Sequence, residues 1–300
     1  MNAELIPKRA KPTPMQTLKE PPSIRLEKNY EMPSVPIVLT RILQLVDDNR
    51  ASAQRLEKLI LHDPPLSARI LKLANSAFFS FRYEVKTISH AIPLLGLNLV
   101  KSLAIGVSVF ESFSKGLREE ITFISQLWMH SIGVGMMAQE IWLKRGNRTE
   151  SEFALLCGLL HDLGKILYFK KDAVGYSRHF ARIKRDPEPD ISALELEHYG
   201  VDHATLGALI AKQWRLPPEL ATVVQHHHSS LTQSRLVAAV SIADMLAKQT
   251  GIGYDGDCKI REDLANMQSL LQMNSQEYDR LAIIAESKRV EIEDFFQFNP

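Results

Sequence analysis

Two apolar stretches of this chain carry ionisable residues at positions where an unpaired charge would be costly. The first is LLCGLLHDLGKI, which holds His161 and Asp162, and the second is PPELATVVQHHH, which ends at His228. A charge buried without a partner destabilises a fold by several kcal/mol, so these groups need partners inside the protein. Together with other residues they form a candidate divalent-metal constellation. The other members are His130, His203, His226, His227 and Asp244.

The apolar residues recur at helical spacing throughout the chain. One stripe between 127 and 141 holds four apolar residues and the single imidazole of His130, which indicates a face turned inward. No stretch shows sustained alternation with period two, and no glycine-rich turn of nucleotide-binding type is present. With 300 residues, 45% of them apolar, the chain is long enough for a sizeable core. The sequence therefore predicts an all-α, multi-helix bundle.

Changes in composition divide the chain into four segments. Residues 1–28 contain five prolines and little apolar periodicity, which predicts a mobile basic arm. Residues 29–114 predict short helices of an N-terminal lobe, and residues 115–251 predict a second lobe with longer helices. Residues 252–300 predict a C-terminal helical appendage, in which the loop GIGYDGD is followed by two amphipathic helices across about 260–273 and 276–296. Their interleaved charges are typical of a solvated face.

Charge and cysteine content restrict partners and location. The 36 basic and 35 acidic residues leave a net charge of +1, so no global attraction to nucleic acid or to an anionic membrane is expected. The apolar segment 87–110 carries Lys101 together with Pro93 and Gly96, which favours buried helices joined at a turn over a membrane span. The two cysteines and the absence of an apolar leader predict a reducing cytoplasm.

The residues around His161 favour chemistry at a metal. Neighbours on a helix diverge by about 100°, so His161 and Asp162 cannot share one face, yet both can reach ions lying against the helix. Gly158 and Gly164 cost helix stability, which suggests that something needs the space beside them. Lys165 adds a positive charge suited to phosphate. Imidazoles with carboxylates suit Fe, Mn or Zn better than Ca or Mg.

Structural interpretations of the same residues stay open. Asp244 lies on a core-facing stripe, where a divalent ion, an arginine or backbone donors would each offset the cost of burial. His130 alone fits a hydrogen-bonded core histidine, and Asp202 before His203 fits a helix cap. For His228 we expect an exposed helix end.

Several motifs in order carry a resemblance to known families. LWMHS, LLHDLGKI, DHATLGALIAKQWRLP, VVQHHH and VSIADML are similar to the HD superfamily of metal-dependent phosphohydrolases, particularly its HD-GYP branch. The earlier segments MPSVPIVLTRILQLV, LEKLILHDPPLSARILKLANSAFF and ISHAIPLLGLNLVKSLAIG resemble the HDOD domain, a relative found in bacterial signalling and regulatory proteins. The resemblance covers about residues 30–250 and implies an HD-type bundle.

The resemblance implies roles for individual residues. Asp162 would bridge two metals, and Lys165 resembles the lysine that contacts substrate phosphate, so these two would be the catalytic residues of an enzyme. The Gly-Tyr-Pro loop of HD-GYP hydrolases is missing after the histidine run, which removes the main reason to expect cyclic di-GMP hydrolysis. The implied metal ligands, for a centre that could be binuclear, are His130, His161, Asp162, His203, His226, His227 and Asp244.

Two functions follow from these observations. The first is a bacterial signal-transduction module that binds divalent metal and acts through interaction with signalling proteins. The alternative is an active metal-dependent phosphohydrolase whose substrate is a nucleotide or a cyclic dinucleotide. No nucleic-acid or membrane partner is expected for either.

Overall fold

The structure of the protein is a computed structural model in which residues 34–45, 49–75, 79, 83–114, 121–186, 190–229, 232–257, 259 and 264–297 are described. Within these ranges the regular secondary structure is helical and contains no strand, which confirms the all-α prediction. The predicted arm at 1–28 lies outside the described residues. None of the described helices is both long and apolar enough to cross a bilayer.

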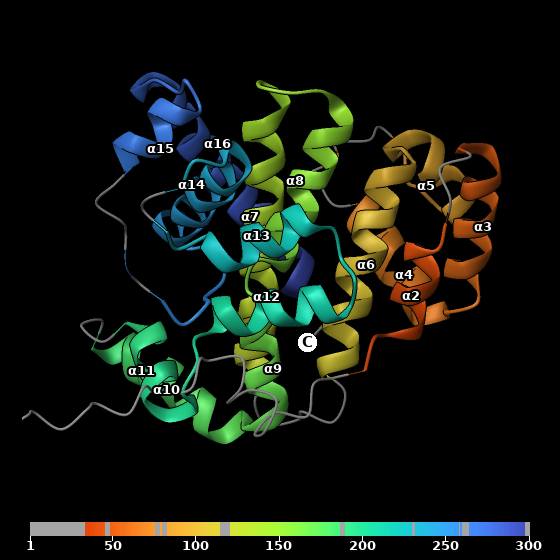
Figure 1. The fold of residues 1–300 in the computed structure, drawn as a ribbon. Coiled ribbons are helices and arrows are strands. Elements are labelled where there is room, and N and C mark those ends of the chain that lie inside the picture. Colours follow the sequence, from red (N-terminus) through yellow and green to blue (C-terminus); the bar gives the residue numbers. More distant parts are fainter. Residues whose placement is uncertain are drawn as a thin grey trace, which may run out of the picture. The chain divides into compact units, whose positions relative to one another are not determined.

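Short helices with clear sequence boundaries build the N-terminal part (Figure 1). Asp63 begins one of them: its side chain accepts a hydrogen bond from the Leu66 N–H, and Pro64 occupies the first turn. The apolar segment 87–110 forms two helices joined at Gly96, whose φ of 95° suits glycine, as predicted. The helices are α2 (Ile37–Leu43), α3 (Asn49–Leu61), α4 (Pro64–Ala74), α5 (Ile88–Leu95) and α6 (Leu97–Ser114).

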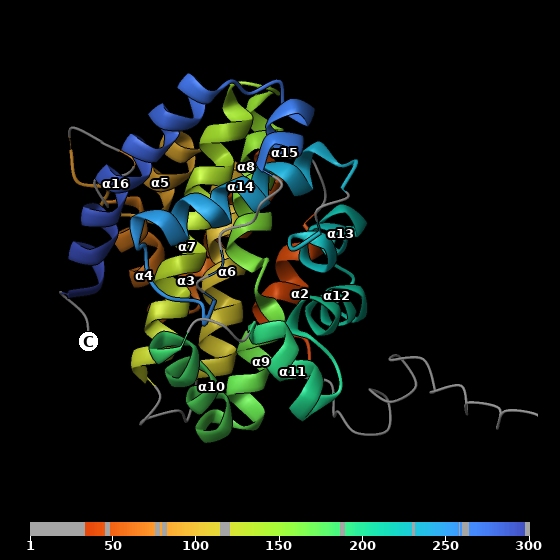
Figure 2. The same cartoon turned by 90° about the vertical axis from the view of Figure 1, so that its left-hand side faces the viewer.

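The helices α7 (Ile121–Leu143) and α8 (Arg148–Leu160) pack against each other and run through the middle of the helical body in both views (Figures 1 and 2). α6 and α14 also contact this pair, and α12 packs on α9 and α13. Helices that are distant in sequence therefore lie next to α8 and α9: α13 and α14 contact α8, and α12 contacts α9. The remaining helices here are α9 (Leu163–Lys171), α10 (Ala173–Arg185), α11 (Ile191–Tyr199), α12 (His203–Gln213), α13 (Pro218–His226) and α14 (Arg235–Thr250).

The two glycines beside His161 permit close helix packing. A Cβ added to Gly158 would lie 2.6 Å from the Gly135 Cα on α7, and one added to Gly164 would lie 2.0 Å from the His203 carbonyl oxygen. The space that the sequence predicted is thus filled by neighbouring backbone. These contacts set the spacing of α7 against α8 and of α9 against α12, the helices that carry candidate ligands.

The C-terminal part contains α15 (Leu264–Leu270) and α16 (Ser275–Gln297), close to the two predicted helices. The loop that precedes them differs from the prediction. Tyr254 N–H donates to the Gln126 carbonyl of α7, and Asp255 and Asp257 are buried. The acidic residues of this loop therefore belong to the interior, because the turn folds back onto α7.

Candidate metal centre

Most of the predicted ligands meet in one buried cluster. His130 comes from the middle of α7 and Asp244 from α14, while His203 is the first residue of α12. His161 and Asp162 occupy a turn between α8 and α9, so the continuous helix expected there is interrupted. No member exposes more than 1% of its surface: His130, His161, Asp162, His203, His227 and Asp244.

Asp162 lies at the centre of this cluster. Its Oδ1 is 3.4 Å from His203 Nε2 and 3.5 Å from His227 Nε2, and its Oδ2 is 3.3 Å from His161 Nε2. Asp162 precedes α9 at the N-cap position, but its carboxylate makes no capping hydrogen bond. An aspartate at this position ordinarily caps the helix. Here its carboxylate is directed at the imidazoles instead.

Asp244 forms a second focus next to the first. Its Oδ1 is 3.0 Å from His130 Nε2 and 4.0 Å from His161 Nε2. His161 therefore lies between the two carboxylates. Ligand atoms that lie within 4.8 Å of one another form three overlapping sets: Asp162, His203, His227 and His228; His130, His161 and Asp244; and His130, Asp162 and Asp255.

Three histidines of the cluster share one orientation: Nδ1 makes a hydrogen bond outside the cluster, and Nε2 points into it. The Nδ1 of His161 is 2.7 Å from the Gly158 carbonyl oxygen, and the Nδ1 of His227 is 2.8 Å from that of Val224. The Nδ1 of His203 is 2.7 Å from the Glu195 carboxylate. Because these partners only accept, each Nδ1 is assigned as a donor, which leaves Nε2 as the ring atom directed at the cluster. Metal-bound histidines in proteins are held in this way.

The histidine run at the end of α13 is placed differently from the prediction. His226 is exposed and lies outside the groups of candidate ligands, while His227 is buried. His228, for which an exposed helix end was expected, is half-buried with its Nε2 2.8 Å from His203 Nε2. The helix ends at His226, and the turn that follows directs the next two side chains inward. The structure therefore pairs His227 with His228 and leaves His226 outside.

Lysines and further carboxylates extend the cluster. Lys165 Nζ lies 2.8 Å from both Asp162 Oδ2 and Asp255 Oδ2, and the residue is fully buried. Lys248 Nζ lies 2.9 Å from Asp244 Oδ2 and 2.8 Å from Asp257 Oδ2. The predicted phosphate contact Lys165 is thus held between two carboxylates. The sequence offered no helical periodicity by which Asp255 or Asp257 could have been found.

Burial and the close approach of these charged groups shift their pKa values. Burial lowers the pKa of His227 to about 3, so its ring is neutral at neutral pH. Burial would also lower the pKa of His161, but the carboxylates of Asp162 and Asp244 raise it above its ordinary value. The pKa of Asp162 stays well below its usual range because His161 and Lys165 outweigh the effect of burial.

The formal charges of the cluster do not balance with neutral histidines. Its five buried carboxylates belong to Asp162, Glu195, Asp244, Asp255 and Asp257. Its two ammonium groups belong to Lys165, which is fully buried, and to Lys248, whose side chain is 5% exposed. Three negative charges therefore remain in a region away from water. A divalent cation between the Nε2 atoms and carboxylates would offset most of them, so the residues present fit such an ion.

The HDOD domain family matches residues 32–230, which is more than half of the chain. This chain belongs to the HDOD family. The HDOD domain protein of unknown function from Geobacter sulfurreducens is 22% identical with a TM-score of 0.72, and the match covers 92% of this chain and 97% of that one. It shows the same fold. The "Putative phosphohydrolase" from Shewanella amazonensis is 26% identical with a TM-score of 0.68, covering 90% of this chain and 97% of that one.

Curated relatives are longer than this HDOD protein. An uncharacterized protein of Treponema pallidum (strain Nichols) is 25% identical over 271 residues, which make up 87% of this chain and 50% of the relative. Ribonuclease Y of Mycoplasma mycoides is 26% identical over 177 residues, 57% of this chain and 35% of that enzyme. The chain thus matches half or less of the length of these relatives.

Glu195 on α11 supports the cluster and was missed from the sequence. Its Oε2 accepts hydrogen bonds from the His203 backbone N–H and from the His203 ring, each at 2.7 Å. The Tyr176 hydroxyl donates to its other oxygen. In the sequence Glu195 stands among acidic residues of a short helix with no clear apolar face. Only the fold distinguishes it from its exposed neighbour Glu197.

Changing Glu195 to glutamine is expected to weaken divalent-metal affinity by about 10–100-fold, because partners that orient metal-bound histidines have effects of this size. Isothermal titration of the metal-depleted protein with Zn²⁺ or Mn²⁺ measures the change. Glu197→Gln on the same helix is the matched control and should bind like the wild type. Equal affinities of Glu195→Gln and wild type would show that Glu195 does not position a ligand.

Proposed function

We propose that this chain is a regulatory HDOD module built around a divalent-metal centre, with interaction with signalling proteins as its output. The observation that carries the proposal is the shared orientation of His161, His203 and His227. Each directs its Nε2 at a carboxylate oxygen of Asp162, at 3.3 to 3.5 Å, while its Nδ1 is fixed by an acceptor. A histidine that served only packing would have no reason to share this arrangement with two others.

One ion would be held by Asp162, His203, His227 and His228, and a second by His130, His161 and Asp244. This mixture of nitrogen and oxygen ligands suits Fe, Mn or Zn. When bound, such ions supply a Lewis acid and lower the pKa of a bound water. The ligands come from helices far apart in sequence, so the ions would also stabilise the native state in proportion to their affinity.

Burial of the cluster supports regulation over catalysis. A substrate phosphate would have to reach the ions and a cation beside them. Lys165, the cation expected for that contact, has no exposed surface and is bound by Asp162 and Asp255. A module of this kind would use the metal to hold its helices in one arrangement, leaving the N-terminal helices α2–α6 for partner binding.

A second candidate is a metal-dependent phosphohydrolase. It is supported by the likeness to the Shewanella protein and to ribonuclease Y, and by the retention of the histidines and aspartates that such chemistry would need. In this case Asp162 would hold both ions, and Lys165 would need to leave Asp255 to meet a substrate.

Elemental analysis of protein purified without chelator tests the metal centre first. We expect at least about one divalent ion per chain, and its absence would refute both candidates. The metal-loaded protein is then incubated with a panel of phosphodiesters, nucleotides and cyclic dinucleotides. No turnover above that of His161→Ala supports the regulatory module. Turnover that His161→Ala abolishes while the fold is kept would establish the hydrolase instead.

A further inference from the structure

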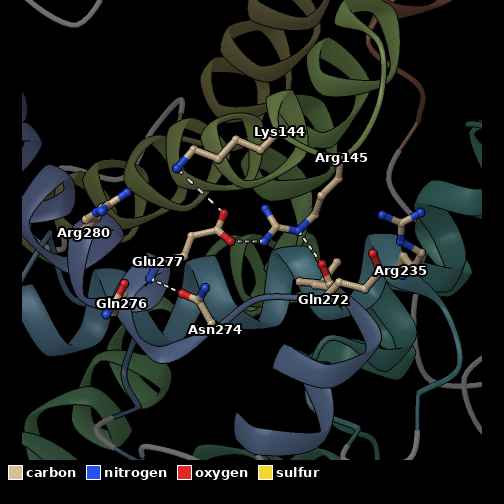
Figure 3. A pocket seen from close by; sticks show the side chains of 9 residues that line it. Lys144, Arg145, Arg235, Gln272, Asn274, Gln276, Glu277 and Arg280 are labelled. Carbon is tan, nitrogen blue, oxygen red and sulfur yellow. Dashed lines mark hydrogen bonds and ion pairs between the residues drawn. The ribbon is translucent and has the colours of Figure 1, made fainter.

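A basic pocket lies at the end of α7, where α14 begins and the turn between α15 and α16 passes (Figure 3). Its volume is about 670 Å³, within the ~300–1,000 Å³ typical of small-molecule sites. None of its residues belongs to the buried metal cluster. It is lined by Lys144, Arg145, Arg235, Leu271, Gln272, Asn274, Gln276, Glu277 and Arg280.

Arg145 forms the fixed wall of the pocket. Its guanidinium donates to the carbonyl oxygens of Ile141 and Leu271, at 2.7 and 2.8 Å, and lies 2.9 Å from Glu277 Oε2. Only 6% of this side chain is exposed. These contacts tie α7 to the α15–α16 turn and to α16. This wall of the pocket is therefore held in place by partly buried hydrogen bonds.

The lining carries an excess of positive charge. Four cations face one carboxylate, that of Glu277, which is engaged by Arg145 and lies 3.8 Å from Lys144 Nζ. Figure 3 shows Arg235 and Arg280 on opposite sides of this central pair. Both arginines are exposed. Lys144, Arg235 and Arg280 thus provide three charges that Glu277 cannot balance.

Two features of the surroundings favour an anion further. α16 begins at Ser275 beside the lining residues Asn274 and Gln276, so the positive end of a 23-residue helix lies at the pocket. The Arg235 guanidinium lies 5.7 Å from the centre of the Trp142 ring, which supports the side chain near the pocket. The planar fork of an arginine matches phosphate oxygens, and several cations suit a group with several negative charges.

We propose that this pocket binds a small molecule with at least two phosphate groups, held chiefly by Arg235 and Arg280 and assisted by Lys144. Its volume fits a compact polyanion. A nucleic-acid strand would call for aromatic stacking surfaces, and the lining residues include no aromatic ring. The overall charge of +1 gives a long nucleic acid no general attraction.

The pocket is connected to the metal centre by continuous helices. Lys144 follows His130 by 14 positions and Arg235 precedes Asp244 by nine on α14, distances of about 21 Å and 13 Å along a helix axis. A ligand held between α7, α14 and α16 would therefore contact the ends of two helices that carry candidate ligands. The pocket is nevertheless a separate site, and its test does not rest on metal binding.

Titration of the full chain with inorganic pyrophosphate tests the proposal. Binding is followed by calorimetry and by the fluorescence of Trp142, and metal content is measured before and after so that extraction of ions is detected. We expect saturable binding, and a loss of about tenfold or more in affinity for Arg235→Gln/Arg280→Gln, because two charge-assisted contacts are removed. Trp142→Phe should abolish the fluorescence change and keep the calorimetric signal.

The matched control is Arg182→Gln/Arg185→Gln on α10, which removes two exposed arginines away from the pocket. It should bind pyrophosphate like the wild type, and circular dichroism checks the fold of every variant. No saturable binding, or equal affinity of the pocket variant and the wild type, would overturn the proposal. Stronger binding of a glutamate-rich peptide than of pyrophosphate would also overturn it, in favour of an acidic protein partner.

Discussion

Replacing Asp162 by alanine is expected to abolish tight metal binding and to lower the free energy of unfolding by about 3–5 kcal/mol, the usual cost of breaking a buried ion pair. Both effects have one origin. The lost carboxylate lies within 3.5 Å of nitrogens of His161, His203 and His227 and accepts from Lys165 at 2.8 Å. Its removal leaves the buried Lys165 with Asp255 alone. Urea unfolding and elemental analysis measure the two effects.

Two further variants separate metal binding from folding. Asp162→Asn keeps the size of the side chain and removes its charge. This variant should be more stable than Asp162→Ala and should still lose the metal. Asp279→Ala on α16 removes an exposed carboxylate and should change neither quantity. An Asp162→Asn protein that retains wild-type metal content would contradict the central position given to this carboxylate.

The sequence predicted the helical architecture because apolar spacing encodes helices directly. It also identified most of the cluster, since an imidazole or carboxylate inside an apolar stripe must face the interior, as His130 and Asp244 do. The turn at Gly96 followed from a residue type whose role in turns is local. These features depend on a few neighbouring residues, which is why a single sequence was enough.

What the sequence could not supply depends on contacts between distant segments. Three consecutive histidines differ by about 100° each around a helix axis, and only the position of the last turn of α13 decides that His227 and His228 face inward. Asp255 lies in a loop that packs on α7, and no periodic pattern in the sequence predicts this contact. Glu195 differs from Glu197 only because the fold places His203 beside it.

Replacing Asp255 by asparagine is expected to lower the free energy of unfolding by about 1.5–3 kcal/mol at neutral pH, the usual contribution of a hydrogen bond to a charged group, because Lys165 and Lys248 lose a shared carboxylate partner while each keeps another. Asp255 Oδ2 lies 2.8 Å from Lys165 Nζ and 3.4 Å from Lys248 Nζ. Urea unfolding measures the difference. The matched control is Asp63→Asn at the start of α4, which should cost little since asparagine caps a helix nearly as well.

A double-mutant cycle shows whether the loss arises from this ion pair. Lys165→Met and Asp255→Asn should each destabilise the fold, and the double variant should lose less than the two changes combined, because no unpaired charge of this pair remains. Additive losses would mean that Asp255 acts through other contacts, such as the hydrogen bond of its Oδ1 with the Asp257 N–H.

The pH dependence of the same variant has a definite sign. Burial raises the pKa of the Asp255 carboxyl, but Lys165 and Lys248 outweigh it and set the pKa at about 2, below the ordinary 3.8. A group with a lowered folded-state pKa contributes stability that is complete above 3.8 and is lost as the pH falls through about 2. The difference in the free energy of unfolding between wild type and Asp255→Asn should therefore stay constant from about pH 8 to 5 and become smaller only below about pH 4. Narrowing already near neutral pH would assign the effect to a histidine of the cluster, since only an imidazole titrates ordinarily in that range.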